Sequence, residues 1–322
     1  MRIVIPGGSG QVGHILARHF HLAGHQVTVL SRNPRPAPWV VLPWDGKNSG
    51  EWTGSLQDSD VCINLTGRSV NCRYSAVNRQ AILNSRVDST HLLALVIESL
   101  PNPPRLWINA STATIYRHSL DRAMNEATGE LGGDEPGAPD TWNFSISVAK
   151  AWEQAFFTQN TPRTRKVAIR SAMTFSPDRG GVFDVFLGLV RHGLGGKQGP
   201  GTQFVSWIHE FDFVRSIDFL IDCESIQGVV NLASPNPLPN ESFMQILREA
   251  WGTRIGLQSP KWLLEIGTFL MRTESELVLK SRKVVPGRLL EASFTFHYPE
   301  WRSAAQELVN RWRLIQRPTR NT

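Results

Sequence analysis

The chain has 322 residues, of which 41% are hydrophobic and 19% are charged. At roughly 100 to 200 residues per domain, this length predicts about two domains. The composition excludes a disordered, fibrous or small disulfide-stapled protein. The formal net charge of +6 suits an anionic ligand, but the basic residues form no nucleic-acid-binding module that we recognise.

The three cysteines, Cys62, Cys72 and Cys223, are odd in number and far apart. They form no C-x-x-C pair and no cysteine–histidine spacing suited to zinc. We therefore predict no metal site, and a reducing compartment, the cytoplasm. The apolar run at the N-terminus and the stretch at 92–97 are both too short to insert into a membrane.

The first thirty residues have the pattern strand, helix, strand. Residues 3–5 are a short apolar run, residues 12–23 have apolar side chains at helical spacing, and residues 26–31 form a second apolar run. Strands and helices then alternate, with helices predicted at 76–100 and 144–158 and strands at 39–42, 61–65, 106–110 and 167–171. This alternation predicts an α/β fold with a doubly wound parallel (Rossmann) sheet.

After about residue 175 the chain is punctuated by glycine and proline, at 180–181, 193–201 and 235–239. We predict that residues 1–175 form one domain, built on this sheet, and that a smaller mixed α/β domain, residues 176–322, binds the substrate. A helix at 211–222 and a strand at 228–233 are expected to return to the first sheet, so residues 210–232 are assigned to the first domain.

The turn between the first strand and the first helix has the sequence GGSGQVG at residues 7–13. Glycines at this spacing, at this place in a βαβ unit, are typical of a dinucleotide site. We assign to Gly7 a tight turn with positive φ, to Gly10 the close approach of a phosphate, and to Gly13 the packing of helix on strand. Gln11 and Val12 begin the helix and are expected beside the cofactor.

The second strand ends in Ser31-Arg32, where an NAD-specific site usually presents a carboxylate to the ribose 2′-hydroxyl. A guanidinium instead holds a 2′-phosphate through two charge-assisted hydrogen bonds, and the Ser31 hydroxyl is a further donor. We therefore predict that residues 1–175 form an NADP-binding domain, which prefers NADP(H) to NAD(H). The alternative is that Arg32 is an ordinary surface arginine.

Three further segments are candidates for cofactor contacts. Leu65, Thr66 and Gly67 close the strand at 61–65, and they either contact the adenosine ribose or pyrophosphate or simply pack the strand end. Arg86, in the helix at 76–100, is either a phosphate-facing group or a solvated helix charge. Residues 44–45 follow the third strand and either touch the adenine or anchor their loop.

On these residues the chain resembles the extended, nucleotide-sugar-epimerase branch of the short-chain dehydrogenase/reductase superfamily, over nearly its full length. The likeness also rests on the segments STATIY at 111–116 and SWIHEFD at 206–212. More narrowly, the segments at 31–32, 85–86, 150–153, 193–196 and 284–290 resemble the atypical epimerase family group 39U, which carries a C-terminal domain of unknown function.

This resemblance implies how NADP(H) is held. It places Ser31 and Arg32 at the 2′-phosphate, and Leu65, Thr66 and Arg86 at the adenosine and diphosphate portion. It places Thr174, after the sixth strand, near the nicotinamide.

The extended branch transfers hydride with a Ser or Thr hydroxyl and a Tyr-x-x-x-Lys pair on the next helix. By resemblance Thr112, with Ser111 beside it, and Lys150 are catalytic candidates, and Lys150 also binds the nicotinamide ribose. The tyrosine place holds Ile146, which has no proton to exchange. The alternative for both hydroxyls is that they cap the strand end by bonding the local backbone.

Tyr116, His118 and His209 are other residues able to exchange a proton. Each is explained at least as well by packing or hydrogen bonding within the fold.

Together these features predict an NADP(H)-binding, epimerase- or oxidoreductase-like protein that acts on an unidentified small polar or sugar-like substrate without the usual catalytic tyrosine. The alternative is a non-catalytic NADP(H)-sensing regulatory protein, for which the resemblance implies a link to cell division. The expected partner is a small-molecule substrate, with neither nucleic acid nor membrane, and a homodimer is left open.

Overall fold

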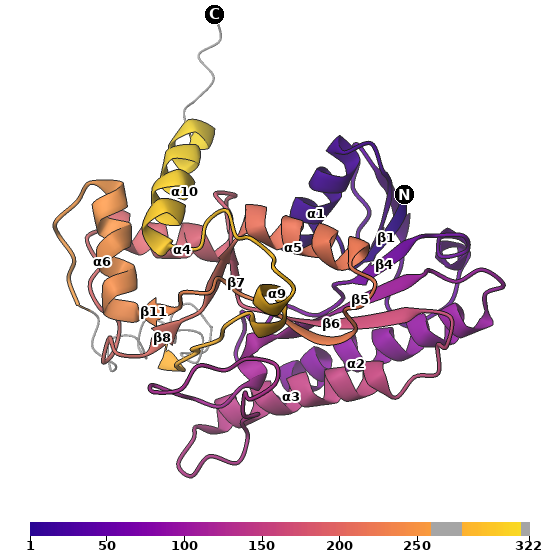
Figure 1. Ribbon diagram of the computed structural model, residues 1–322, viewed down its shortest axis with the longest axis horizontal. Coiled ribbons are helices and arrows are strands. Elements are labelled where there is room, and N and C mark those ends of the chain that lie inside the picture. Colours follow the sequence, from indigo (N-terminus) through magenta and orange to yellow (C-terminus); the bar gives the residue numbers. More distant parts are fainter. Residues whose placement is uncertain (259–278, 317–322) are drawn as a thin grey trace, which may run out of the picture. The chain divides into compact units, whose positions relative to one another are not determined.

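The computed structural model describes residues 1–258 and 279–316, and the chain divides into two compact units (Figure 1). The first unit comprises Met1–Ile115, Leu131–Ser171 and Val214–Val230. The second comprises Tyr116–Glu130, Ala172–Phe213 and the chain from Asn231 onward. The predicted first domain, residues 1–175 with 210–232, also included 116–130, 172–175, 210–213 and 231–232, which belong to the second unit in the structure.

The first unit is built on a seven-stranded sheet with the order β10-β6-β5-β4-β1-β2-β3. Strands β1 to β6 pair in parallel along this order. The chain runs outward from β1 to β3 and then resumes on the other side of β1 with β4, so the predicted doubly wound sheet is confirmed. The strands are β1 (Arg2–Pro6), β2 (Gln26–Ser31), β3 (Val40–Pro43), β4 (Val61–Asn64), β5 (Leu106–Thr112), β6 (Arg165–Ser171) and β10 (Gly228–Leu232).

Helices cover both faces of this sheet. Figure 1 shows α1 (Gln11–Leu22) and α5 (Glu210–Asp222) on one face, and α2 (Ala76–Ser99) and α3 (Asp140–Phe157) on the other. The Ser75 hydroxyl caps α2 by accepting the Asn78 N–H, and α1 ends before Gly24, which has a φ of +81°. Short 3₁₀ turns lie at η1 (Glu51–Ser55) and η2 (Ala113–Ile115).

The core of the first unit explains its apolar strand sequences. All four residues of β4 are buried, as expected for a parallel strand that is covered on both faces. Trp107 of β5 is fully buried and meets the Phe156 ring of α3 edge-on, with the ring centroids 4.7 Å apart. This packing anchors the amino end of β5 on the last turn of α3.

The second unit has its own aromatic core. The rings of Phe243 and Trp301 stack with centroids 4.3 Å apart, and Phe175 packs against both. Its strands form two small sheets, β7–β9 parallel and β8–β11 antiparallel. Its elements are β7 (Met173–Phe175), α4 (Val182–Arg191), β8 (Phe204–Val205), β9 (Trp207–His209), β11 (Leu238–Pro239), α6 (Asn240–Trp251), α9 (Gly287–Glu291) and α10 (Trp301–Gln316).

Candidate cofactor site

The turn after β1 has the geometry that its sequence requires at Gly7. This residue has a φ of +74°, and its N–H donates to the Leu30 carbonyl at 2.9 Å. A Cβ on Gly7 would lie 2.7 Å from the backbone N of Thr66. Both the positive φ and the close approach of the β4 end therefore demand glycine here.

The other two glycines of the spacing play different parts. A Cβ on Gly13 would lie 2.4 Å from the Cα of Gly8, so the first turn of α1 packs on the preceding turn only without a side chain. A Cβ on Gly10 would meet no atom within 4 Å. The space at Gly10, at the N-terminus of α1, is therefore open to a ligand phosphate.

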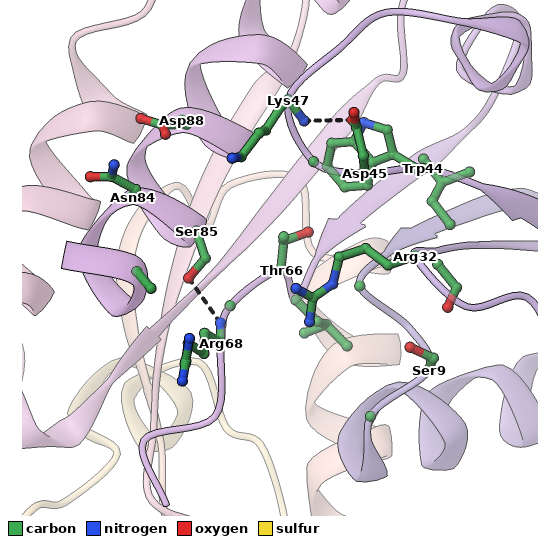
Figure 2. Close-up of a pocket in the computed structure, with 18 of the residues that line it drawn as sticks. Ser9, Arg32, Trp44, Asp45, Lys47, Thr66, Arg68, Asn84, Ser85 and Asp88 are labelled. Carbon is green, nitrogen blue, oxygen red and sulfur yellow. Dashed lines mark hydrogen bonds between the residues drawn. The ribbon is translucent and has the colours of Figure 1, made fainter. Parts of the chain in front are cut away.

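A pocket of about 770 Å³ lies beside this turn, entirely within the first unit. The carboxyl ends of β1, β2 and β4, the loop after β3 and one face of α2 line it (Figure 2). Its volume is ordinary for a small-molecule or cofactor site. The lining residues include Gly7, Ser9, Gly10, Ser31, Arg32, Trp44, Lys47, Leu65, Thr66, Gly67, Arg68, Asn84, Ser85 and Asp88.

Two cations of the pocket have no partner in the described part of the chain. The exposed guanidinium of Arg32 and the exposed ammonium of Lys47 form no hydrogen bond or ion pair with any residue of 1–258 or 279–316. Figure 2 shows Arg32 reaching toward Thr66, and Lys47 extending from the loop after β3 toward α2. Ser31 is buried, and its Oγ accepts the Asn33 N–H at 3.2 Å. This edge of the pocket suits an anion.

Two polar atoms of the pocket lining are buried without a hydrogen bond to any residue that the structure describes. They are Nε1 of Trp44 and Oγ1 of Thr66. Because a buried donor or hydroxyl normally finds a partner, these atoms are suited to hydrogen-bonding a ligand. The cradle that excludes a Cβ at Gly7 and the two unpaired atoms together fit a dinucleotide.

Asp45 anchors its own loop. Its Oδ1 accepts the N–H groups of Lys47 and Asn48 at 2.8 and 2.9 Å, and its Oδ2 accepts the Asn48 side-chain amide at 2.6 Å. These hydrogen bonds, foremost those from the Asn48 and Lys47 backbones, lower the pKa of Asp45 to about 2. Of the two interpretations left open for residues 44–45, Asp45 fits the loop anchor, while Trp44 lines the pocket.

Some predicted cofactor contacts do not line this pocket. Nη1 of Arg86 donates to the carbonyls of Ile82 and Arg68 at 2.9 and 3.2 Å, and its guanidinium lies 5.1 Å from the Trp152 ring centroid. Burial lowers the pKa of Arg86 to about 10. Gln11 and Val12 are half-buried at the start of α1 and are likewise outside the pocket lining.

The catalytic candidate Ser111 is part of a buried network. Its Oγ donates to Oε1 of Glu153 at 2.6 Å, and Arg170 pairs with both carboxylate oxygens at 2.8 and 2.7 Å. All three residues are more than nine-tenths buried. The prediction of local backbone capping is wrong for Ser111, because Glu153 of α3 reaches its hydroxyl. For Thr112 it holds, since Oγ1 accepts the Thr114 N–H at 3.2 Å.

Lys150 and Ile146 share one face of α3. Ile146 is 1% exposed, and a Cβ on Gly133 would touch both its Cγ2 and the Lys150 Nζ, at 3.3 and 3.4 Å. Lys150 is half-buried, and its ammonium has no hydrogen bond or ion pair with the residues that the structure describes. The lysine is thus available to a ligand, while its helical neighbour is an apolar core residue.

The remaining sequence candidates lie in the second unit. Thr174 is buried on β7, where it pairs with Ile208 of β9. Tyr116 is buried and donates to Oδ1 of Asn231 at 2.9 Å. His118 Nδ1 accepts the Ser281 N–H at 3.0 Å, and His209 bonds Glu307 at 2.8 Å. Tyr116, His118 and His209 are all used by the fold.

Several lining residues were not predicted from the sequence. Lys47 and Arg68 lie in loops after β3 and β4, where no periodic pattern marks them. Asn84, Ser85 and Asp88 lie on α2 with spacings of one, three and four residues, which places them on one helical face. That spacing was visible in the sequence and is the signal by which they could have been found.

Within 1–258 and 279–316, no three His, Cys, Asp or Glu side chains are placed to share a metal ion. Over the same ranges, every helix is too short or too polar to cross a bilayer.

Comparisons with known proteins agree with this geometry. The model of the NAD dependent epimerase/dehydratase family matches residues 3–233, and that of a domain of unknown function, DUF1731, matches residues 259–308. The epimerase family protein SDR39U1 of Mus musculus is 30% identical over 315 residues, covering 96% of this chain and 100% of that protein. The Homo sapiens protein is 29% identical over 312 residues, with the same coverage.

Solved structures extend the likeness. The crystal structure of human SDR39U1 (isoform 2) with NADPH has a TM-score of 0.83 at 29% identity, and the match covers 96% of this chain and 99% of that one. A nucleoside-diphosphate sugar epimerase from Corynebacterium glutamicum has a TM-score of 0.71 at 26% identity, and the match covers 95% of this chain and 57% of that one. The chain belongs to the NAD-dependent epimerase/dehydratase family.

Proposed function

We propose that the protein binds NADP(H) in the pocket beside β1 and acts as an epimerase- or oxidoreductase-like enzyme on a small polar or sugar-like substrate. The observation that carries the cofactor choice is Arg32. It stands at the end of β2, lines the pocket and has no partner among the described residues, at the place where a carboxylate would select NAD(H). The human relative crystallised with NADPH supports the same choice.

Different residues of the first unit would hold different parts of the cofactor. Arg32 and Ser31 would hold the 2′-phosphate, and the open space at Gly10 would admit the pyrophosphate to the N-terminus of α1. Thr66 and Trp44 would offer their unpaired polar atoms to the adenosine portion. Leu65 and Gly67 would form the pocket wall at the end of β4.

Fewer residues support a role in catalysis than in cofactor binding. When bound, the nicotinamide supplies a hydride acceptor or donor. Lys150 is proposed as the ligand of the nicotinamide ribose, because its half-buried ammonium is unpaired within the described residues. Thr112 is retained as a candidate to position substrate, and Ser111 to orient β5 through Glu153. Thr174 and Arg86 remain predicted contacts of the nicotinamide and diphosphate portions.

Calorimetric binding of NADPH and NADH tests the cofactor choice. We expect the wild-type protein to bind NADPH at least about 10-fold more tightly than NADH, since a bidentate phosphate contact contributes more than about 1.4 kcal/mol. Arg32→Glu should abolish or reverse that preference. Arg35→Glu is the matched control, because Arg35 is exposed and outside the pocket lining. Equal affinities of the wild-type protein for both cofactors would refute the proposal.

The second candidate function is a non-catalytic NADP(H) sensor, and the buried Ile146 favours it. Loss of general acid–base catalysis typically lowers a rate by about 10² to 10⁴. A sensor would bind NADPH with the Arg32-dependent preference, yet would leave nucleotide-sugar substrates unchanged. Epimerisation of such a substrate at ordinary enzyme rates would instead exclude the sensor.

The compartment and the partners are also proposed. Cys62, Cys72 and Cys223 are free thiols, which suits a reducing compartment such as the cytoplasm. The size of the pocket suits a small-molecule ligand.

A further inference from the structure

The first unit carries a positioned phenol that the sequence analysis did not consider. An alcohol can give up a hydride only if its hydroxyl proton passes to a base, and the reverse reaction needs a proton donor. Beside Lys150, α3 presents the buried apolar side chain of Ile146. A proton-exchanging group for this site must therefore come from another segment of the chain.

Tyr74 lies in the loop between β4 and α2, and its phenol reaches α3. Its Oη is 3.3 Å from Oγ of Ser145, the residue next to Ile146. Its ring meets the Phe144 ring edge-on, with the centroids 5.0 Å apart. Arg79 Nε donates to the Tyr74 carbonyl at 2.9 Å. These contacts fix a half-buried phenol beside the helix that carries Lys150.

Two arginines of α2, Arg86 and Arg79, interact with Tyr74. From α2, the Arg86 guanidinium interacts electrostatically with Tyr74, and no carboxylate within the described residues forms an ion pair with Arg86. Arg79 is paired with Asp140, the carboxylate at the start of α3. A cation close to a phenol favours its ionised form.

We propose that Tyr74 is the proton-exchanging residue of this site, acting on a secondary alcohol or the corresponding ketone bound against its Oη. This inference rests on the proposed NADP(H) function. In oxidation, the carbinol C–H bond breaks and its electron pair passes to the nicotinamide as hydride. The O–H bond breaks as the C=O double bond forms, and the proton passes to the Oη of ionised Tyr74, which becomes the neutral phenol. Reduction reverses each transfer.

The chain has three tyrosines, Tyr74, Tyr116 and Tyr298, so their ionisation can be followed individually by the ultraviolet absorbance of tyrosinate. Tyr116 is 1% exposed, and burial together with Glu307 raises the pKa of Tyr298. We expect one phenol to ionise about one pH unit or more before the other two. Tyr74→Phe should remove this early step, and the matched control Tyr298→Phe should leave it in place.

The redox state of the cofactor then tests whether Tyr74 faces the nicotinamide. The ring carries a positive charge only in NADP⁺. A phenol beside it should therefore ionise about one pH unit lower with NADP⁺ bound than with NADPH bound. A wild-type protein without the early step, or with the same early step in both complexes, would overturn the assignment to Tyr74.

The same samples separate the two proposals. Suppose that NADPH binds with the Arg32-dependent preference, but that Tyr74 ionises at the same pH with NADP⁺ and with NADPH bound. Then only the assignment to Tyr74 is overturned, and the proposed cofactor binding stands. If neither cofactor binds at all, the proposed function fails, and the assignment to Tyr74 fails with it.

Discussion

Two regions of the first unit lie at the carboxyl edge of one sheet and are built in opposite ways. Around β1, β2 and β4, glycines and backbone amides shape a pocket whose cations, Arg32 and Lys47, are unpaired in the described chain. Around β5, β6 and α3, side chains satisfy one another, as in the network of Ser111, Glu153 and Arg170. The first region is prepared for a ligand, and much of the second is occupied by its own residues.

This difference shows which part of a binding site can be formed by the backbone alone, without polar side chains. A phosphate cradle needs only a positive φ and missing Cβ atoms, so it is fixed once the turn folds. A catalytic group must present a free polar atom at one point. In the second region, Lys150 has an ammonium that is unpaired among the described residues, and Tyr74 is the proposed proton-exchanging residue, held against Ser145.

The largest expected effect is a loss of stability in the region around β5, β6 and α3, where buried side chains bond one another. Arg170→Met leaves the Glu153 carboxylate buried without its cation, and the free energy of unfolding should fall by about 3 to 5 kcal/mol. Urea denaturation measures this. Arg105→Met removes an ion pair with Asp60 in which the arginine side chain is 74% exposed, and it should change stability by less than about 1 kcal/mol. Equal losses in the two variants would contradict the distinction between the regions.

A smaller effect tests the pocket region. Gly7→Ala and Gly24→Ala both place a Cβ at positive φ, with φ of +74° and +81°, and this strained backbone alone should cost each variant about 1 to 2 kcal/mol of stability. The new Cβ at Gly24 meets no atom within 4 Å, whereas at Gly7 it displaces Thr66.

NADPH titration should therefore show an affinity lower by about 10-fold or more, about 1.4 kcal/mol, for Gly7→Ala only. Unchanged binding by Gly7→Ala would mean that this turn does not shape the site.

The smallest expected effect is a shift in the pKa of Asp45, in the loop after β3. Asn48→Ala removes the side-chain amide that Asp45 accepts, and the pKa of Asp45 should rise from about 2 toward its ordinary value of 3.8. Because the folded pKa is depressed, ionised Asp45 supports the loop above its ordinary pKa, and that support is lost as the pH falls through about 2. NMR titration of the Asp45 carboxyl measures the shift, and an unmoved midpoint would assign it to the backbone donors alone.

Most of the fold of the first unit could be predicted because its signals are local. Strands buried on both faces appear as apolar runs, so the predicted bounds of β2 and α2 agree with the structure within one residue. The start of α3 was set at Phe144, whereas the helix begins at Asp140, because its first turn is polar and shows no apolar period. Strands as short as β8 and β11, two residues each, have no period at all.

Site residues could be predicted from the sequence where a position requires one particular residue type. Arg32 was predicted to line the site because a positive charge follows the second strand. The glycines were predicted because a turn this tight needs a residue that can adopt positive φ or that lacks a Cβ. Glu153 as the partner of Ser111 was not predicted, because a contact across 42 residues leaves no trace in local spacing. Arg86 shows a related limit, since helical periodicity does not reveal that Nη1 bonds the Ile82 and Arg68 carbonyls.

Each compact unit is assembled from three separate stretches of chain, and this has a consequence for synthesis. Strand β6 borders β5 on one side and β10 on the other. While the ribosome makes the elements between β6 and β10, at about 5 to 20 residues per second, the nascent sheet exposes an unpaired edge. Folding of the first unit therefore finishes only after much of the second unit has emerged, so chaperones that shield strand edges should bind the growing chain during this interval.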